Sequence, residues 1–230
     1  KKNKIKIIED SSEALGASIN GKKVGSLGDI NVTSIRSEKM IGVGEGAVIS
    51  TNNKDLFNKI SLIASRYSPF RRSTDSYWKK YFVSGEGYNY LMPHLLGSIA
   101  RAQIERFKKD LVLKKILVGK IYRKNFNIKN IRFTQKILKN HTPVFWLNSI
   151  YFEKLSKEKI RKLGTKLKKK GIEVRSGFWP LNSLKCFKSI YFTENNITKK
   201  IFEKSLILPS SYDLKVKDIK KINNTVTRLI

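Results

Sequence analysis

The sequence predicts an α/β domain followed by a smaller α+β domain. Two observations lead to this fold class. In the first half of the 230-residue chain, short β-branched runs are followed by a segment of helical periodicity. A long helical pattern over residues 93–126 then leads to a second half with its own strands and helices. A helix of that length commonly bridges two domains, so we assign residues 1–110 to a large domain and residues 111–230 to a small one.

Three strands and one helix are expected near the start of the chain. Residues 4–9 form a β-branched run that ends at Asp10 and is typical of a buried strand. Residues 30–35 and 46–50 predict two further strands, and a glycine-punctuated, turn-rich stretch precedes them. Residues 53–67 place apolar side chains at helical spacing after an asparagine, a preferred N-cap, and therefore predict a helix.

A long aromatic stretch, residues 68–93, follows without clear periodicity. Loops of that length inside a compact domain are usually functional or interfacial. Beyond the long helical pattern, Gly171 closes one of the helices expected in the second half, as a glycine C-cap does. The elements expected there are a strand, a helix, a second strand and a last helix, at residues 142–152, 157–170, 172–179 and 214–230.

Composition narrows the class of protein. Lys and Arg number 48 against 18 Asp and Glu, and the net charge of +30 is typical of nucleic-acid-binding proteins. The lysines, however, are spread over almost every expected helix. No zinc-finger spacing, RNP-type motif or helix-turn-helix pattern accompanies them. This distribution favours solvated helix faces and argues against a nucleic-acid partner.

The sequence also bears on localisation. No apolar run approaches the ~18–20 residues that span a bilayer, and the first residues contain no apolar core typical of a signal peptide. Cys186 is the single cysteine and cannot form an internal disulfide, which fits a reducing compartment. We therefore expect a cytoplasmic protein without a membrane partner.

One lysine stands apart from the others. Lys39 lies between the strand at 30–35 and a Gly-Glu-Gly turn, five residues after Ser34. Asp10 ends another strand, and ligands of α/β sheets bind at the carboxyl ends of strands. An amine, a carboxylate and a hydroxyl are the minimal set for pyridoxal phosphate, because they bind it covalently, keep its pyridine nitrogen protonated and bind its phosphate. Asp and Ser are common, so the spacing alone also permits Lys39 to be an ordinary surface cation.

The residues around Lys39 carry a specific resemblance. The string "IIEDSSEALGASINGKKVGSLGDINVTSIRSEKMIGVGEGAVIST" resembles the core of the DegT-type nucleotide-sugar aminotransferases. The resemblance continues through residues 87–107, 169–182 and 206–214 and so covers nearly the whole chain. It implies a pyridoxal-phosphate-dependent transferase of fold type I. In that fold this chain would form part of a large domain with a mostly parallel sheet, followed by a smaller α+β C-terminal domain.

The resemblance also implies roles for five residues. Lys39 matches the lysine that binds the cofactor covalently, and Asp10 matches the partner of the pyridine nitrogen. Glu13 falls where the family has a polar residue near the ring oxygen of the cofactor. Ser34 matches the phosphate-binding hydroxyl. Asn89, in "GYNY", matches the residue that reaches the cofactor phosphate of the other subunit, which implies a homodimer with shared active sites.

The chain departs from the family pattern in places. Residues 35–38 replace the usual aromatic and glycine-containing stretch before the lysine, and Leu91 stands where an arginine is common, so the sugar specificity is open. The family also has a long portion before the aspartate that Asp10 matches, including the helix N-terminus that cups the phosphate. We therefore expect this chain to be a C-terminal fragment of a longer protein.

Together these observations predict an aminotransferase that moves an amino group from glutamate to a nucleotide-linked keto-sugar. The expected setting is perosamine-type or related amino-sugar biosynthesis for surface polysaccharide, with no metal in the site. Two alternatives stay open, namely a basic nucleic-acid-binding protein and a catalytically incomplete fragment of the aminotransferase. The keto-sugar and the ring carbon that receives the amino group are not specified by the sequence.

Overall fold

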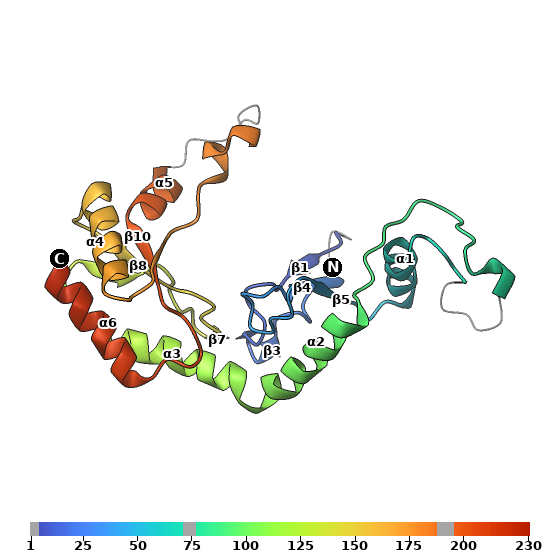
Figure 1. The fold of residues 1–230 in the computed structure, drawn as a ribbon, viewed down its shortest axis with the longest axis horizontal. Coiled ribbons are helices and arrows are strands. Elements are labelled where there is room, and N and C mark those ends of the chain that lie inside the picture. The colour runs from blue at the N-terminus through green and yellow to red at the C-terminus, as the bar shows by residue number, and fades with distance from the viewer. Residues whose placement is uncertain (1–4, 71–76, 188–195) are drawn as a thin grey trace. The chain divides into compact units, whose positions relative to one another are not determined.

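The chain folds into two compact units, Lys1–Lys109 and Asp110–Ile230. Each unit has its own sheet and its own hydrophobic core. The structure, a computed structural model, describes residues 5–70, 77–187 and 196–230 (Figure 1).

The sheet of the first unit has β4 (Ile30–Ser34) between β1 (Ile8–Asp10) and β5 (Ala47–Ser50). β1 runs parallel to β4, and β5 runs antiparallel to it. The resemblance implies a mostly parallel sheet for the large domain; the described strands of this chain form one parallel and one antiparallel pair. The cause lies in the connection from β4 to β5. Residues 35–46 contain no helix, whereas a parallel pair requires a long crossover that is usually helical.

β1 is shorter than the strand expected over residues 4–9, and the first residue of that range lies outside the described residues. Pairing begins at Ile8, which lies opposite Ile30. Among the described strands β1 is at the edge of its sheet, and the side chains of Ile7 and Ile8 are 54% and 71% exposed. The run that predicted a buried strand is thus an exposed one in this structure.

Helix α1 (Lys54–Ala64) confirms the helix expected over residues 53–67, but it is shorter. Asn53 caps the helix, because its side-chain oxygen accepts a 2.9 Å hydrogen bond from a backbone N–H in the first turn. The helix stops before Arg66 and Tyr67, whose φ angles of 64° and 53° lie in the left-handed region that a right-handed helix cannot include.

The turn-rich stretch before β4 contains a small hairpin. Its strands are β2 (Ser18–Ile19) and β3 (Lys22–Lys23), which pair antiparallel. Asn20 and Gly21 between them have φ angles of 50° and 77°. Two consecutive positive φ angles are what a type I′ turn requires, and Asn-Gly is the sequence that adopts it most readily.

The described part of the aromatic stretch, residues 68–70 and 77–93, contains no α-helix and no named strand, as its lack of periodicity predicts. Residues 71–76 lie outside the described residues. The described remainder contains one short 3₁₀ turn, η1 (Tyr77–Lys79), and extended or turn backbone.

The helix expected over residues 93–126 is present, but its geometry changes along its length. It begins as α2 (His94–Arg106), continues through a π-helical segment, η2 (Phe107–Leu111), and ends as α3 (Val112–Asn125). A π-helical turn holds one residue more than an α-helical turn and occurs mostly as a single bulge inside a helix.

The second unit contains a four-stranded antiparallel sheet in the order β6–β8–β10–β9. β8 and β9 confirm the two strands expected here but are shorter than predicted, and β6 and β10 were not predicted. A short strand, β7 (His141–Thr142), precedes β8 in the chain. The sheet strands are β6 (Ile131–Phe133), β8 (Asn148–Phe152), β9 (Arg175–Ser176) and β10 (Ser205–Leu208).

Helices α3, α4 (Lys157–Lys169) and α6 (Val216–Leu229) pack with this sheet around the core of the second unit. α4 and α6 confirm the helices expected at 157–170 and 214–230. Two 3₁₀ turns, η3 (Leu181–Ser183) and η4 (Lys185–Phe187), and helix α5 (Asn196–Glu203) complete the described elements. The buried core side chains are Val118, Tyr122, Phe126, Ile150, Phe152, Ile160, Leu163, Leu167, Ile172, Leu206, Leu208, Ile219, Ile222 and Val226.

Two helix glycines of this unit give a matched test of its packing. A Cβ at Gly119 in α3 would collide with the ring of Phe145, which is buried and has no room to withdraw. A Cβ at Gly164 in α4 would meet Val174 at 3.6 Å, an ordinary contact. We expect Gly119→Ala to lower the free energy of unfolding by about 1–3 kcal/mol through overpacking. Gly164→Ala should raise it by about 0.5–1 kcal/mol through helix propensity.

Urea unfolding followed by circular dichroism measures both changes. Equal effects of the two substitutions would contradict the packing of α3 against Phe145.

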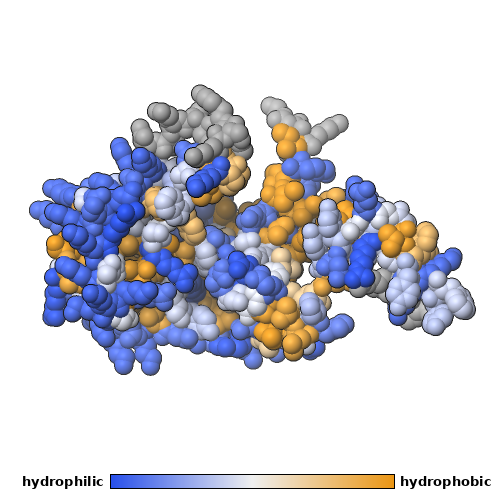
Figure 2. Space-filling model, turned by 45° about the horizontal axis from the view of Figure 1, so that its top comes forward, coloured by the Kyte–Doolittle hydropathy of each residue, from blue (hydrophilic) through white to orange (hydrophobic). Residues whose placement is uncertain are grey.

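Charged side chains cover much of the surface of the second unit. Figure 2 shows hydrophilic residues over most of its visible face, whereas hydrophobic residues gather on parts of the first unit. This pattern agrees with lysines that lie on solvated helix faces. Within residues 5–70, 77–187 and 196–230, no helix combines the length and the apolar character needed to cross a membrane.

Candidate active site

Lys39 lies on the loop that connects β4 to β5, and backbone hydrogen bonds close this loop. The N–H of Ile35 donates to the carbonyl of Gly46 at 3.0 Å, and the N–H of Ser37 donates to the carbonyl of Gly44 at 2.9 Å. Gly44 and Gly46 have φ angles of 106° and 149°, which favour glycine. The chain therefore reverses between Ser37 and Gly44, and the Gly-Glu-Gly segment is the returning side that leads into β5.

Apolar side chains of the same loop pack into the core of the first unit. Ile35, Ile41 and Val43 are buried and pack with Ala100 of α2 in the core of the first unit. Partly buried residues complete this cluster, namely Leu15, Met92, Leu96 and Phe107. Ile35 before Lys39 and Ile41 after it are held in the core, and this fixes both ends of the short segment that carries the lysine.

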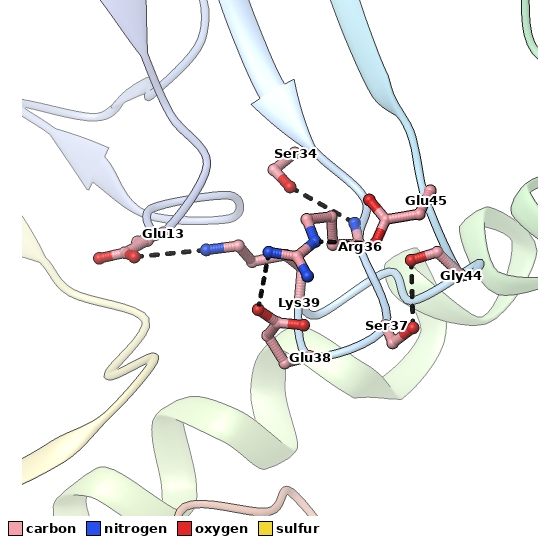
Figure 3. Close-up of polar contacts among 8 residues, drawn as sticks. All are labelled: Glu13, Ser34, Arg36, Ser37, Glu38, Lys39, Gly44 and Glu45. Atoms are coloured by element: carbon pink, nitrogen blue, oxygen red, sulfur yellow. Dashed lines mark hydrogen bonds and ion pairs between the residues drawn. The ribbon is translucent and has the colours of Figure 1, made fainter.

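The side chain of Lys39 is directed toward Glu13 (Figure 3). Lys39 Nζ lies 3.3 Å from Glu13 Oε1, and the two form an ion pair. The Lys39 side chain is only 11% exposed, whereas that of Glu13 is 52% exposed. The amine is thus withdrawn from bulk solvent, and the Glu13 carboxylate contributes to its direction.

Asp10 ends β1 and carries a stabilised negative charge. Its carboxylate accepts a 3.0 Å hydrogen bond from the backbone N–H of Ser12. Hydrogen bonds from the hydroxyl and the backbone of Ser12 lower the pKa of Asp10 against a small opposing effect of burial, and the positive charge of Lys39 lowers it further. Asp10 is therefore ionised at neutral pH, within electrostatic range of the lysine.

Ser34 ends β4, which runs parallel to β1, so that the carboxyl ends of both strands meet at one edge. Its backbone N–H donates to Ser12 Oγ at 3.1 Å. Its own Oγ accepts from the N–H of Arg36 at 3.4 Å, as Figure 3 shows. Ser12 thereby links the two strand ends that carry Asp10 and Ser34.

Asn89 lies on another element. Its neighbours Tyr88 and Tyr90 donate backbone hydrogen bonds of 2.7 and 2.9 Å to carbonyls of Ile63 and Ala64 in α1. Asn89 itself is exposed and forms an isolated bridge with Ser65. The structure thus gathers four of the five predicted site residues at the β1–β4 edge and places the fifth on the segment beside α1.

Arg36 occupies the part of the loop that departs from the family pattern. Its Nε lies 3.2 Å from Glu45 Oε1, and its Nη1 lies 3.5 Å from Glu38 Oε1. Glu45 belongs to the Gly-Glu-Gly turn, so this ion pair joins the outgoing and returning sides of the loop (Figure 3). The arginine therefore stabilises the loop that carries Lys39 by forming ion pairs with Glu38 and Glu45.

The sequence reasoning missed Ser12 at this site, and it also missed Glu9, which holds the loop before β4. The Glu9 carboxylate accepts N–H groups of Gly25, Leu27 and Gly28 at 2.7, 2.9 and 3.2 Å. Burial opposes ionisation of Glu9, yet these three donors lower its pKa. A signal for Ser12 was present in the sequence, because an Asp at a strand end often accepts the N–H of the second residue after it.

The chemistry of these side chains fits pyridoxal phosphate. The arrangement offers a shielded amine at Lys39, an ionised carboxylate at Asp10 and a hydroxyl at Ser34, all near one sheet edge. In contrast, no group of three or more His, Cys, Asp or Glu side chains in the described part of the chain is arranged to hold a metal ion.

Comparisons with known proteins agree with this chemistry. The profile of the DegT/DnrJ/EryC1/StrS aminotransferase family matches residues 1–227. GDP-perosamine synthase of Escherichia coli O157:H7 is 30% identical over 204 residues, which are 89% of this chain and 52% of that protein. GDP-perosamine synthase of Caulobacter vibrioides is 30% identical over 94% of this chain and 56% of its own length. The chain thus spans about half the length of the curated relatives it matches.

Solved structures resemble this one in fold. PseC of Helicobacter pylori, an aminotransferase involved in the biosynthesis of pseudaminic acid, has a TM-score of 0.86 at 19% identity, over 99% of this chain and 60% of its own. The protein Spr1654 of Streptococcus pneumoniae, in its PMP form, has a TM-score of 0.86 at 20% identity, over 98% of this chain and 59% of its own. Because the family profile spans nearly all of it, the chain belongs to the DegT/DnrJ/EryC1/StrS aminotransferase family.

Proposed function

We propose that this chain contributes the lysine side of the active site of a pyridoxal-phosphate-dependent aminotransferase that acts on a nucleotide-linked keto-sugar. The observation that carries the proposal is the gathering of Lys39, Asp10, Ser34 and Glu13 at the carboxyl edge of β1 and β4. Family membership and relatives named GDP-perosamine synthase support the same reaction class.

Each residue has a separate task in this proposal. When bound, pyridoxal phosphate supplies the electron sink that amino-group transfer requires. Lys39 holds the cofactor through Nζ and, once released from it, moves a proton with the same atom. Asp10 keeps a negative charge where the pyridine nitrogen would lie, and Ser34 offers its hydroxyl to the phosphate. Glu13 orients the Lys39 amine through their 3.3 Å contact.

The substrates follow from charge and from the relatives. A nucleotide-linked sugar carries a diphosphate, and a chain with a net charge of +30 attracts it over a long range. We take glutamate as the amino donor and a perosamine-type keto-sugar as the acceptor. UDP-4-amino-4,6-dideoxy-N-acetyl-beta-L-altrosamine transaminase of Campylobacter jejuni is 26% identical and matches the full chain, which supports an amino-sugar product more broadly.

A homodimer with shared sites belongs to the same proposal. The segment that carries Asn89 is held to α1 by backbone bonds and leaves the Asn89 side chain exposed. Large aromatic side chains of the preceding stretch are also exposed, with Trp78 at 93% and Tyr81 at 90%. Exposed aromatic groups of this kind are enriched at protein interfaces. In the proposal, Asn89 reaches the cofactor phosphate of the partner subunit.

Borohydride trapping tests the assignment of Lys39. We expect reduction in the presence of pyridoxal phosphate to fix the cofactor on the peptide that contains Lys39, because its amine is shielded and oriented, unlike the solvated lysines. Peptide mapping by mass spectrometry identifies the modified residue. Lys39→Arg should abolish the labelling, and Lys22→Arg, in the exposed hairpin, is the matched control that should preserve it. Label on another lysine would refute the assignment.

A further inference from the structure

We propose that Ser12 is a positioning residue that holds the Asp10 carboxylate and the carboxyl end of β4 in one hydrogen-bonded unit. The proposal rests on the proposed function, in which Asp10 faces the pyridine nitrogen of the cofactor. Ser12 itself touches neither substrate nor cofactor in this account. It acts through the two residues that do.

The contacts of Ser12 point in two directions. Its backbone N–H donates to Asp10 Oδ1 at 3.0 Å. Its hydroxyl oxygen accepts the backbone N–H of Ser34 at 3.1 Å. The hydroxyl proton stays available to Asp10, and the Ser12 side chain is the largest cause of the lowered pKa of Asp10. Ser12 therefore joins the ends of two neighbouring strands, because its backbone N–H donates to Asp10 and its hydroxyl oxygen accepts from Ser34.

The preceding residue gives Ser12 a rigid base. Ser11 is fully buried, and its Oγ lies 2.7 Å from Asn31 Oδ1 and 2.6 Å from Thr33 Oγ1. Its backbone N–H donates to the carbonyl of Val32 at 2.9 Å. Ser11 thus fixes the backbone to the interior of the sheet, so that the next residue presents its hydroxyl at a defined place on the edge.

Asp10 needs such a support because it is exposed and ends an edge strand. A solvated carboxylate on a free strand end samples several rotamers, whereas a site that pairs with a ring nitrogen requires one orientation. The backbone N–H of Ser12 favours that orientation by donating to Asp10 Oδ1, and we infer that the hydroxyl of Ser12 reinforces it. The charge of Lys39 also acts on Asp10, but it attracts the carboxylate without fixing its direction.

The test compares the ionisation of Asp10 in Ser12 variants of the cofactor-free full chain. The carboxyl carbon of Asp10 is followed by NMR during a pH titration, and its signal is assigned by its loss in Asp10→Asn. We expect Ser12→Ala to raise the pKa of Asp10, because the hydroxyl donor is lost while the backbone N–H at residue 12 remains. We expect Ser12→Thr to restore the wild-type pKa, because it keeps a hydroxyl.

Ser26→Ala is the matched control. The Ser26 hydroxyl donates to the carbonyl of Lys23 at 2.6 Å within a surface turn, and its removal should leave the pKa of Asp10 unchanged. Amide exchange at Ser34 gives a second measurement, because its N–H loses its acceptor in Ser12→Ala and should exchange faster. If Ser12→Ala does not fold, Ser12→Cys replaces it, since a thiol is a weak donor and a weak acceptor.

The outcomes separate this proposal from the proposed function. An unchanged pKa of Asp10 and unchanged exchange at Ser34 in a folded Ser12→Ala protein would overturn the role of Ser12, even if borohydride still labels Lys39. A raised pKa of Asp10 together with no label on Lys39 would support the role of Ser12 as a support of Asp10 and would instead refute the proposed function.

Discussion

Asp10→Asn is expected to lower turnover at least about a hundredfold, the scale on which removal of one preorganised electrostatic contact acts in enzymes. An amide has nearly the shape of the carboxylate but no charge, so it cannot keep a ring nitrogen protonated. Ser12 lowers the pKa of Asp10, so the wild-type carboxylate stays charged to a lower pH than an ordinary Asp. The deficit of the variant should therefore persist down to that lower pH. Steady-state kinetics with a nucleotide-linked keto-sugar at several pH values measures it.

Labelling of Lys39 by borohydride should survive in Asp10→Asn, because the lysine and its contact with Glu13 are untouched. Asp29→Asn is the matched control. Asp29 lies just before β4, at the end of the strands opposite to the one that carries Asp10 and Ser34. Its carboxylate accepts the N–H of Ile7 at 2.9 Å. We expect the turnover of this variant to resemble the wild type. Unchanged turnover in Asp10→Asn would exclude the proposed role of this carboxylate.

Mixing an Asn89→Ala chain with a Lys39→Ala chain is expected to restore activity that neither parent has. If each site takes Lys39 from one subunit and Asn89 from the other, a hybrid dimer contains one intact site and one site that lacks both. Random exchange of equal amounts gives about half hybrids, so the mixture should reach about a quarter of wild-type activity. Activity is measured after unfolding and joint refolding, with each parent treated alike.

The control for this experiment is a mixture of Lys39→Ala with Asp10→Asn. Both residues lie at the same sheet edge of one subunit, so no hybrid of these chains contains an intact site. Recovery in this mixture as well would mean that subunit mixing itself restores activity. No recovery in the mixture of Asn89→Ala and Lys39→Ala would place Asn89 outside the partner's site and remove the argument for shared sites.

The sequence predicted the elements with a strong pattern. β4, α1, α4 and α6 all have clear periodicity or caps, and the structure contains them. The strand expected over 142–152 begins only at Asn148, since Phe145 has a φ of 52° and breaks the extended backbone. That angle depends on tertiary packing, where the Phe145 ring lies 4.0 Å from the Arg123 guanidinium, and no local pattern encodes it.

β10 shows a second limit of sequence reasoning. Its four residues, Ser205–Leu208, are all buried, because the strand pairs on both sides with β8 and β9. A buried central strand lacks the alternation of polar and apolar residues that reveals a half-exposed strand, and a run of this length is too short to be recognised by composition.

Part of the candidate site could likewise be predicted from the sequence, and part could not. Asp10 was found because it ends a strand, a position that local pattern reveals, and Ser34 was found by its spacing from Lys39 and by the family resemblance. The contact of Lys39 with Glu13 joins residues 26 positions apart and depends on how the 35–46 loop folds over its core. The bridge through Ser12 depends on the register of β1 against β4, which requires pairing between distant segments. Long-range geometry of this kind is absent from any single stretch of sequence.

The π-helical segment Phe107–Leu111 changes the direction in which later side chains point around the helix axis. Val118 follows Ala100 by 118 − 100 = 18 positions, about five whole turns of an α-helix, so an uninterrupted helix would align the two. The additional residue of the π turn rotates every later side chain by about 100°. A helical wheel drawn through the whole of 93–126 therefore places the apolar residues of α2 and α3 on one stripe. In the helix itself the π turn separates them into two stripes. Such a turn is the form that a one-residue insertion takes when a helix absorbs it without breaking, so removing one residue there would return the segment to regular α-helix and leave the phase of the residues on either side unchanged.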